Sequence, residues 1–101
     1  MMRWKLSDVG KVQRMRFVLG DGQPMDLSGS PTVTLELVPA AQPRAAVTSL
    51  GCAVVSVDGR ASYTRQASDI TSEGNYRARG KKTTGASDVQ ISEWEDLLVE
   101  L

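Results

Sequence analysis

The sequence predicts an all-β sandwich domain, built from about seven short antiparallel strands and one short helical turn. Two observations favour this fold. Several segments alternate apolar and polar residues with a period of two, which is typical of half-buried strands. Turn-forming residues separate these segments at intervals of about eight to twelve residues. The chain has 101 residues, enough for one such domain over 1–101, with residues 1–10 either part of it or an arm.

The first two strands are expected on either side of a glycine-rich turn. Over Val12–Leu19 every second residue from Met15 onward is apolar, and two arginines occupy the other face. Residues 20–24 contain two glycines and a proline, which end a strand. Pro31 opens the second strand, which has the clearest alternation in the chain. Its core-facing residues are expected to be Val33, Leu35 and Leu37.

A β-hairpin is expected in the middle of the chain. After a loop over 39–43, a strand interrupted near Gly51 is expected from about Ala46 to Val57. The pair Asp58-Gly59 joins it to a strand over 61–64. An Asp-Gly pair between two β-prone segments is the strongest short-range hairpin signal.

The remainder of the chain predicts one helical turn and two or three strands. The turn is expected over Ala67–Gly74, with Ser68 or Asp69 as its N-cap. Strands are then expected over Asn75–Lys82, Asp88–Ile91 and Trp94–Leu101. Together these elements predict an immunoglobulin-like β-sandwich.

The composition argues against nucleic acid, a membrane or an export route. Twelve basic residues balance twelve acidic ones, so the whole chain has no charge bias toward a polyanion. The first six residues lack the apolar segment of a signal peptide, and no apolar run approaches the roughly twenty residues of a membrane span. Cys52 is the single cysteine and is expected to be a small buried thiol. Synthesis in a reducing cytoplasm is therefore expected.

The residue types argue against an enzyme and against a bound cofactor or metal. The sequence has no histidine, which is the commonest general base and metal ligand. Its serines lie in no nucleophile-elbow motif, and a nitrogen-and-sulfur zinc site cannot be built from one cysteine. Asp21 and Asp26 are either turn-forming residues or a weak calcium site without the spacing of a calcium loop. We therefore expect no catalysis, no cofactor and no small-molecule substrate.

A basic stripe is the first candidate interface. Arg77, Arg79 and Lys81 project from one face of a predicted strand. The stripe is interpreted either as a solvated face or guarded edge strand, or as a docking surface for an acidic partner. Five acidic residues and no basic one lie between Asp88 and Glu100. That segment either docks in a neighbouring copy of the chain or lies beside the basic stripe within one domain.

The terminal segments supply the other candidate interface residues. Trp4 and Trp94 are each expected to be half-buried at an end of the sandwich or to anchor a partner, because large aromatic residues dominate interface energetics. The last five residues place apolar side chains on both faces of a strand, including Leu98 and Leu101. We expect this strand to be covered, by its own domain or by a neighbour.

Two stretches resemble a known family. The first is Gly20-Asp21-Gly22-Gln23-Pro24-Met25-Asp26-Leu27-Ser28-Gly29 with the alternating strand after it. The second is Val57-Asp58-Gly59-Arg60-Ala61-Ser62-Tyr63, followed by Asp69, Gly74 and Tyr76. Together they resemble the immunoglobulin-like domain at the N-terminus of bacteriophage baseplate upper proteins, which also occurs alone in small phage virion proteins. Where the family often has Gly-Asp after its first short strand, this chain has Ser7-Asp8.

The resemblance implies structural roles for four residues. Leu27 would fill the core, and Asp69, Gly74 and Tyr76 would form a region like the tyrosine corner, where the phenol hydroxyl returns to the backbone. It also implies a virion component of a tailed phage, made in the host cytoplasm, with other virion proteins and copies of itself as partners. A baseplate, tail or neck position is expected. The alternatives are a capsid decoration protein and an accessory module that binds host glycans.

Overall fold

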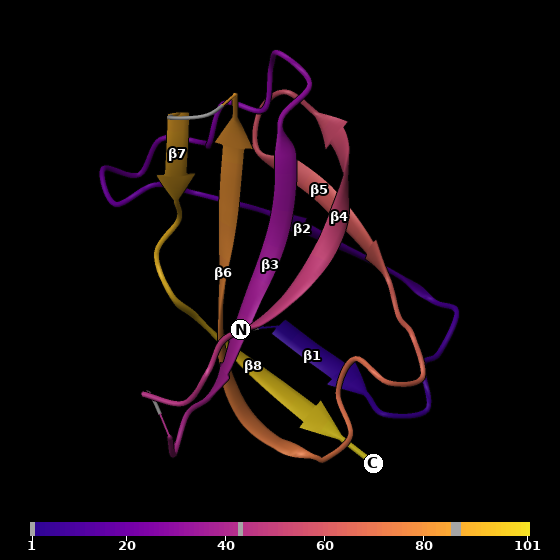
Figure 1. Ribbon diagram of the computed structural model, residues 1–101. Helices are drawn as coiled ribbons and strands as arrows, with labels where there is room; N and C mark the ends of the chain where they lie inside the picture. The colour runs from indigo at the N-terminus through magenta and orange to yellow at the C-terminus, as the bar shows by residue number, and fades with distance from the viewer. Residues whose placement is uncertain (1, 43, 86–87) are drawn as a thin grey trace.

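Eight strands form one mixed sheet within the residues that the computed structural model describes, which are 2–42, 44–85 and 88–101 (Figure 1). Residue 43 of the expected 39–43 loop and residue 1 of the expected arm lie outside these ranges. The strands are β1 (Met2–Lys5), β2 (Val12–Arg16), β3 (Thr32–Pro39), β4 (Thr48–Ser56), β5 (Arg60–Thr64), β6 (Gly74–Thr84), β7 (Asp88–Ile91) and β8 (Glu95–Glu100).

The sheet curls into a half-barrel with the order β1-β8-β6-β3-β4-β5-β2, and β7 pairs beside β8 on β6. Every pair is antiparallel except β1 with β8. The four-residue strand β1 was not expected from the sequence. The two separate sheets of the predicted sandwich are not confirmed, because a single path of paired strands runs through both halves.

Strand β4 makes the sheet continuous. Its first part, up to Cys52, pairs with β3, and its second part, from Ala53, pairs with β5. The register shifts between Val54 and Ser56, which is a β-bulge or a similar irregularity. A bulge increases local twist and bends a strand, so β4 can pass from one half of the sheet to the other.

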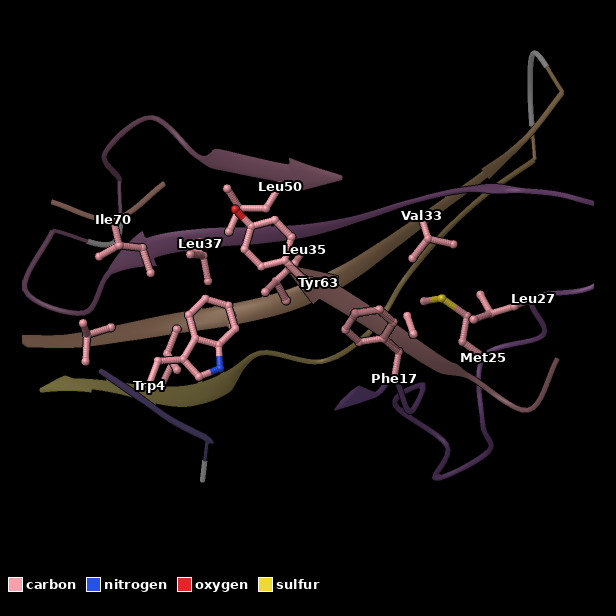
Figure 2. Packing of buried hydrophobic residues seen from close by; sticks show 14 residues of the cluster. Trp4, Phe17, Met25, Leu27, Val33, Leu35, Leu37, Leu50, Tyr63 and Ile70 are labelled. Atoms are coloured by element: carbon pink, nitrogen blue, oxygen red, sulfur yellow. The ribbon is translucent and has the colours of Figure 1, made fainter. Parts of the chain in front are cut away.

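The core lies inside the curl (Figure 2). Val33, Leu35 and Leu37 of β3 are exposed by 2% or less, as their alternation predicts. Figure 2 shows Phe17, Met25 and Leu27 at one end of the core and Trp4 and Ile70 at the other, and the Trp4 ring is stacked on Tyr63 with centroids 6.0 Å apart. The apolar residues of distant segments therefore share one core.

The predicted helical turn over 67–74 is wrong. This segment contains no helix. The Asp69 carboxylate, which was expected to cap the helical turn, instead accepts hydrogen bonds from the Arg65 side chain. Among the described residues of the whole chain, no helix is long and apolar enough to span a membrane. Asp69 therefore belongs to a buried ion pair and is not a helix N-cap.

A buried ion pair between Arg65 and Asp69 ties three segments together. Nε of Arg65 lies 2.9 Å from Oδ2 of Asp69, and the two side chains are exposed by only 1% and 2%. The Arg65 guanidinium also donates to the Lys5 carbonyl oxygen at 2.6 Å and lies 5.4 Å from the centroid of the Trp4 ring. The Tyr63 hydroxyl donates to Asp69 Oδ2 at 2.7 Å. β1, β5 and the 65–70 segment are thereby joined.

The same contacts shift two pKa values in opposite directions. Burial acts to raise the pKa of Asp69, but hydrogen bonds from Arg65, the Gln66 amide and Tyr63 outweigh it, so this pKa lies below its usual value. Burial and the hydrogen bond to the Asp69 carboxylate raise the pKa of Tyr63. Asp69 is therefore ionised and Tyr63 protonated at neutral pH.

We expect Asp69→Asn to lower the free energy of unfolding by about 3–5 kcal/mol, because it leaves the buried Arg65 charge uncompensated. The double variant Arg65→Met with Asp69→Asn should lose less than Asp69→Asn alone. Urea denaturation measures both. A double variant that is less stable than the single one would contradict the interpretation.

The ion pair also predicts a pH dependence. Because the folded pKa of Asp69 is lowered, its contribution to stability is present above the unfolded pKa of about 4 and is lost as the pH falls through the folded pKa. Hence the stability difference between the wild type and Asp69→Asn should shrink in acid. Urea midpoints of both proteins at several pH values below 5 test this; a constant difference would contradict it.

Gly80 is required by the packing of Phe17. A Cβ atom at Gly80 would overlap the Phe17 ring, whereas one at Gly51 would meet nothing within 4 Å. We expect Gly80→Ala to destabilise the fold by about 1–3 kcal/mol through overpacking. Gly51→Ala, the matched control, should change stability by no more than about 0.5 kcal/mol. Combining Gly80→Ala with Phe17→Leu should restore part of the loss in thermal denaturation; no recovery would contradict this contact.

Candidate interaction surface

Trp94 lies in the segment between β7 and β8 and packs on two arginines of β6. The guanidinium carbon of Arg79 is 4.3 Å from the centroid of the Trp94 ring, and that of Arg77 is 5.7 Å from it. The two arginines are two residues apart on one strand, so they project from the same face. Each cation–π contact at such a site contributes about 0.5–1 kcal/mol. Trp94 is half-buried, as one of its sequence interpretations predicted.

Arg79 is also held by an ion pair on this face. Its Nε donates to Oε1 of Glu36 at 2.9 Å, and Glu36 lies directly opposite it on β3. The Glu36 side chain is exposed by 10% and that of Arg79 by 26%. Arg79 therefore has an acidic and an aromatic partner within its own domain.

The basic stripe is not on an edge strand. β6 pairs with β3 along one side and with β8 and β7 along the other, so the interpretation of a guarded edge is wrong. Arg77 is exposed, whereas Arg79 and Lys81 are half-buried. The stripe is a partly covered outer face of the sheet.

The acidic C-terminal segment lies beside the basic stripe in the same chain. β8 pairs antiparallel with β6, which places Asp96 opposite Arg77. Of the two arrangements that the sequence left open, adjacent strands are present in this domain. Docking of the stripe on a second copy stays a prediction.

Trp4, the other tryptophan considered for an interface, lies in the core. Its side chain belongs to β1, is exposed by 3%, and contacts Tyr63 and Arg65. The expectation that it is half-buried is wrong, because the curl of the sheet and the Arg65 side chain cover it. Its ring offers no surface to a partner in this structure.

The C-terminal strand is covered by its own domain. β8 lies between β1 and β6, and its side chains Leu97 and Val99 are each exposed by 1%. Leu98 is half-buried on the opposite face, and Leu101 is 79% exposed. Leu101 is therefore the apolar residue of this segment that remains accessible.

The four residues with predicted structural roles have defined places. Leu27 is buried in the core at 2% exposure. Gly74 has a φ of 138°, at the start of β6, and Asp69 lies in the buried ion pair. The half-buried Tyr76 donates its hydroxyl hydrogen to the Ser72 carbonyl oxygen at 2.8 Å. The hydroxyl thus returns to the backbone four residues earlier.

Two buried basic residues were missed as structural elements. Arg65 was not considered, although it stands four residues before Asp69. Lys82 was included only in the basic segment, yet it is 5% exposed and its Nζ donates to the Asp26 carbonyl oxygen at 2.8 Å. The period of two from Tyr76 through Ala78 and Gly80 would have placed Lys82 on the inner face.

The turn aspartates and the cysteine have structural contacts. Oδ1 of Asp21 accepts from the Gln23 amide at 3.0 Å, and Oδ1 of Asp26 accepts from the Ser28 amide at 2.9 Å. These are Asx turns, which agree with the turn-forming interpretation. The backbone amide of Ser28 is the main cause of the lowered pKa of Asp26. Burial raises the pKa of the half-buried Cys52 thiol to about 11, which leaves it protonated at neutral pH.

No protein-family model and no curated protein matches this sequence.

We expect Tyr76→Phe to lower the free energy of unfolding by about 1 kcal/mol, the value of one hydrogen bond. Ser72→Ala is the companion variant: it removes the Ser72 hydroxyl, which lies 3.4 Å from the Tyr76 hydroxyl, but it keeps the 2.8 Å bond to the Ser72 carbonyl oxygen and should cost less. Thermal denaturation measures both. Equal stability of Tyr76→Phe and wild type would place the phenol hydroxyl in water.

Proposed function

We propose that this chain is a non-enzymatic structural subunit of a tailed bacteriophage particle, in the baseplate, tail or neck. It would assemble with other virion proteins and with copies of itself through edge strands and termini. The resemblance to the domain of baseplate upper proteins is the basis of this proposal. The contacts between the two stretches that carry the resemblance support it.

Those two stretches pack directly on each other. The Leu27 amide donates to the Val57 carbonyl oxygen at 3.0 Å, and just before the first stretch the Phe17 amide donates to that of Gly59 at 2.8 Å. Gly59 has a φ of 93°, and a Cβ atom there would lie 2.6 Å from the Phe17 carbonyl oxygen and 3.2 Å from the Met25 nitrogen. The hairpin glycine and the Gly20–Gly29 loop thus depend on each other, which gives a physical reason for their joint occurrence.

We also propose that the half-barrel is a variant of the immunoglobulin-like sandwich. Its two layers would be β1, β8, β6, β7 and β3 on one side and β5 and β2 on the other, with β4 shared. Val33 of β3 and Ala61 of β5 belong to the same hydrophobic core, so the two layers would enclose one core, as in a sandwich.

Three free strand edges suit an assembling subunit. β1, β2 and β7 each pair with a strand on one side only, within the part of the chain that is described. Unpaired strand edges are templates for pairing with other chains. The exposed Leu101 beyond β8 adds an apolar contact point near β1.

Immunogold electron microscopy of phage particles from the source lysate tests the proposal. An antibody raised against this domain should place gold at the tail tip or the collar. Antibody pre-absorbed with the purified domain is the control. Gold over the head surface would favour the decoration-protein alternative, and antigen found only in solution, with intact and disrupted particles both unlabelled, would overturn the virion assignment.

A further inference from the structure

β2 has a free edge with unpaired backbone groups. It pairs with β5 alone, and the Phe17 amide and the Lys11 carbonyl both hydrogen-bond toward β5. In an antiparallel pair, alternate residues turn their amide and carbonyl groups to opposite sides. The backbone amide and carbonyl groups of Val12, Arg14 and Arg16 therefore point to the free edge. No described residue forms a hydrogen bond with these groups.

A cavity of about 190 Å³ lies along this free edge. Met15 and Phe17 bound it on the β2 side, and Met2 and Trp94 bound it on the opposite side. No residue of β5 lines it, so it lies on the unpaired side of β2. Leu35 and Ala78 also line it, which means that it opens to the core of the half-barrel.

The open edge has a defined length. At one end the Glu93 amide approaches the Val18 carbonyl oxygen at 3.4 Å, and at the other the last pair of the β2–β5 register is Val12 with Thr64. Between these points lies β2, Val12–Arg16. The edge is therefore long enough for a short added strand, and the segment before β8 bounds it beyond Phe17.

The outer surface beside the edge is basic. Arg14 and Arg16 project outward with the 55%-exposed Val12, and Arg60 lies opposite Arg16 on β5. Arg60 and Arg16 share one acidic neighbour: Asp58 lies 3.6 Å from Arg60, and its carbonyl oxygen accepts from Arg16 Nε. Arg14 has no ion-pair partner among the described residues. On this outer surface the arginines favour acidic side chains of a partner, whereas the cavity wall carries both the acidic Glu93 and Glu95 and the basic Arg16 and Arg79.

The other strand edges of the chain do not complement this one. β1 carries the basic residues Arg3 and Lys5, and its Lys5 carbonyl already accepts from Arg65. The single acid of β7, Asp88, lies 4.0 Å from Lys82. Pairing β2 with β2 of a second copy would bring arginines together, which is destabilising. The charges therefore favour a different protein over a second copy.

We propose that β2 binds, by strand addition, an extended segment of another protein in which acidic and apolar residues alternate. The apolar side chains enter the cavity beside Phe17, and the acidic ones lie over Arg14 and Arg16. Backbone hydrogen bonds to Val12, Arg14 and Arg16 supply the affinity, as in other complexes formed by β-strand addition. The proposal does not depend on the virion assignment, because it follows from the β2 edge alone.

The first test uses fluorescence anisotropy with the full chain and a labelled peptide of about eight alternating glutamate and valine residues. A peptide of the same composition in shuffled order and an alternating lysine–valine peptide are the controls. The glutamate–valine peptide should bind at least about tenfold more tightly than either control. Equal binding of the shuffled peptide would overturn the proposal.

A pair of variants separates the backbone contribution from the charge. Arg14→Ala keeps the outward amide and should weaken binding by about two- to threefold, the value of one exposed charge. Arg14→Pro also removes that amide, which β5 does not use, and should weaken binding by about a further tenfold. Equal affinities of the two variants would overturn strand addition. Circular dichroism establishes that both are folded.

Amide hydrogen exchange of the unmodified chain gives a readout that does not need a variant. In the free protein the amides of Val12, Arg14 and Arg16 should exchange fast, whereas those of Gln13 and Met15 should be protected. Adding the glutamate–valine peptide should protect the first set. Protection of the Val12, Arg14 and Arg16 amides in the free protein would overturn the proposal. Self-association that Arg14→Pro abolishes would also overturn it, because the strand bound at β2 would then belong to a second copy.

Discussion

The buried contact between the Arg65 guanidinium and the Asp69 carboxylate holds one end of the half-barrel closed. It connects β5 to the carbonyl of Lys5 on β1 and places a flat cation against the Trp4 ring. A buried charge without a partner destabilises the folded state. Replacing either residue alone therefore leaves the other as an uncompensated buried charge. The stacked Trp4 and Tyr63 rings complete this end of the core. The Arg65–Asp69 ion pair thus fixes the position of β1.

The curl of the sheet determines what each face can do. The inner face of β3 and β6 is filled by core residues and by the close contact of Phe17 with Gly80. The outer face carries the Glu36–Arg79 pair and the Trp94 ring. Because the sheet does not close between β2 and the segment before β8, one edge remains open next to the core. Two residues of the basic stripe, Arg77 and Arg79, contact Trp94 within the domain, whereas the outward backbone groups of β2 have no hydrogen-bond partner among the described residues.

Local patterns predicted most strands, and long-range pairings explain what they missed. Alternation located β3 and the Asp58-Gly59 pair located the hairpin, since both signals depend on neighbours in sequence. β1 escaped notice because it is four residues long and its partner, β8, lies at the other end of the sequence. The segment after Ala67 looked like a capped helical turn because the carboxylate that caps a helix can equally accept hydrogen bonds from an arginine. The shared face of Arg77 and Arg79 was predictable from their spacing, but the loop residue Trp94 that covers them was not.

The parallel pairing of β1 with β8 has a consequence for the order of folding. Met2 pairs with Leu97, so β1 has no partner strand until the residues of β8, more than ninety positions later, have been made. Contacts between residues far apart in sequence close large loops, and domains rich in them fold slowly. Until β8 is present, β1 has no strand to pair with, and that pairing does not yet hold the Trp4 ring against Tyr63 and Arg65. During synthesis the nascent chain therefore exposes an aromatic strand, which is a site for a chaperone to bind or for premature aggregation to begin.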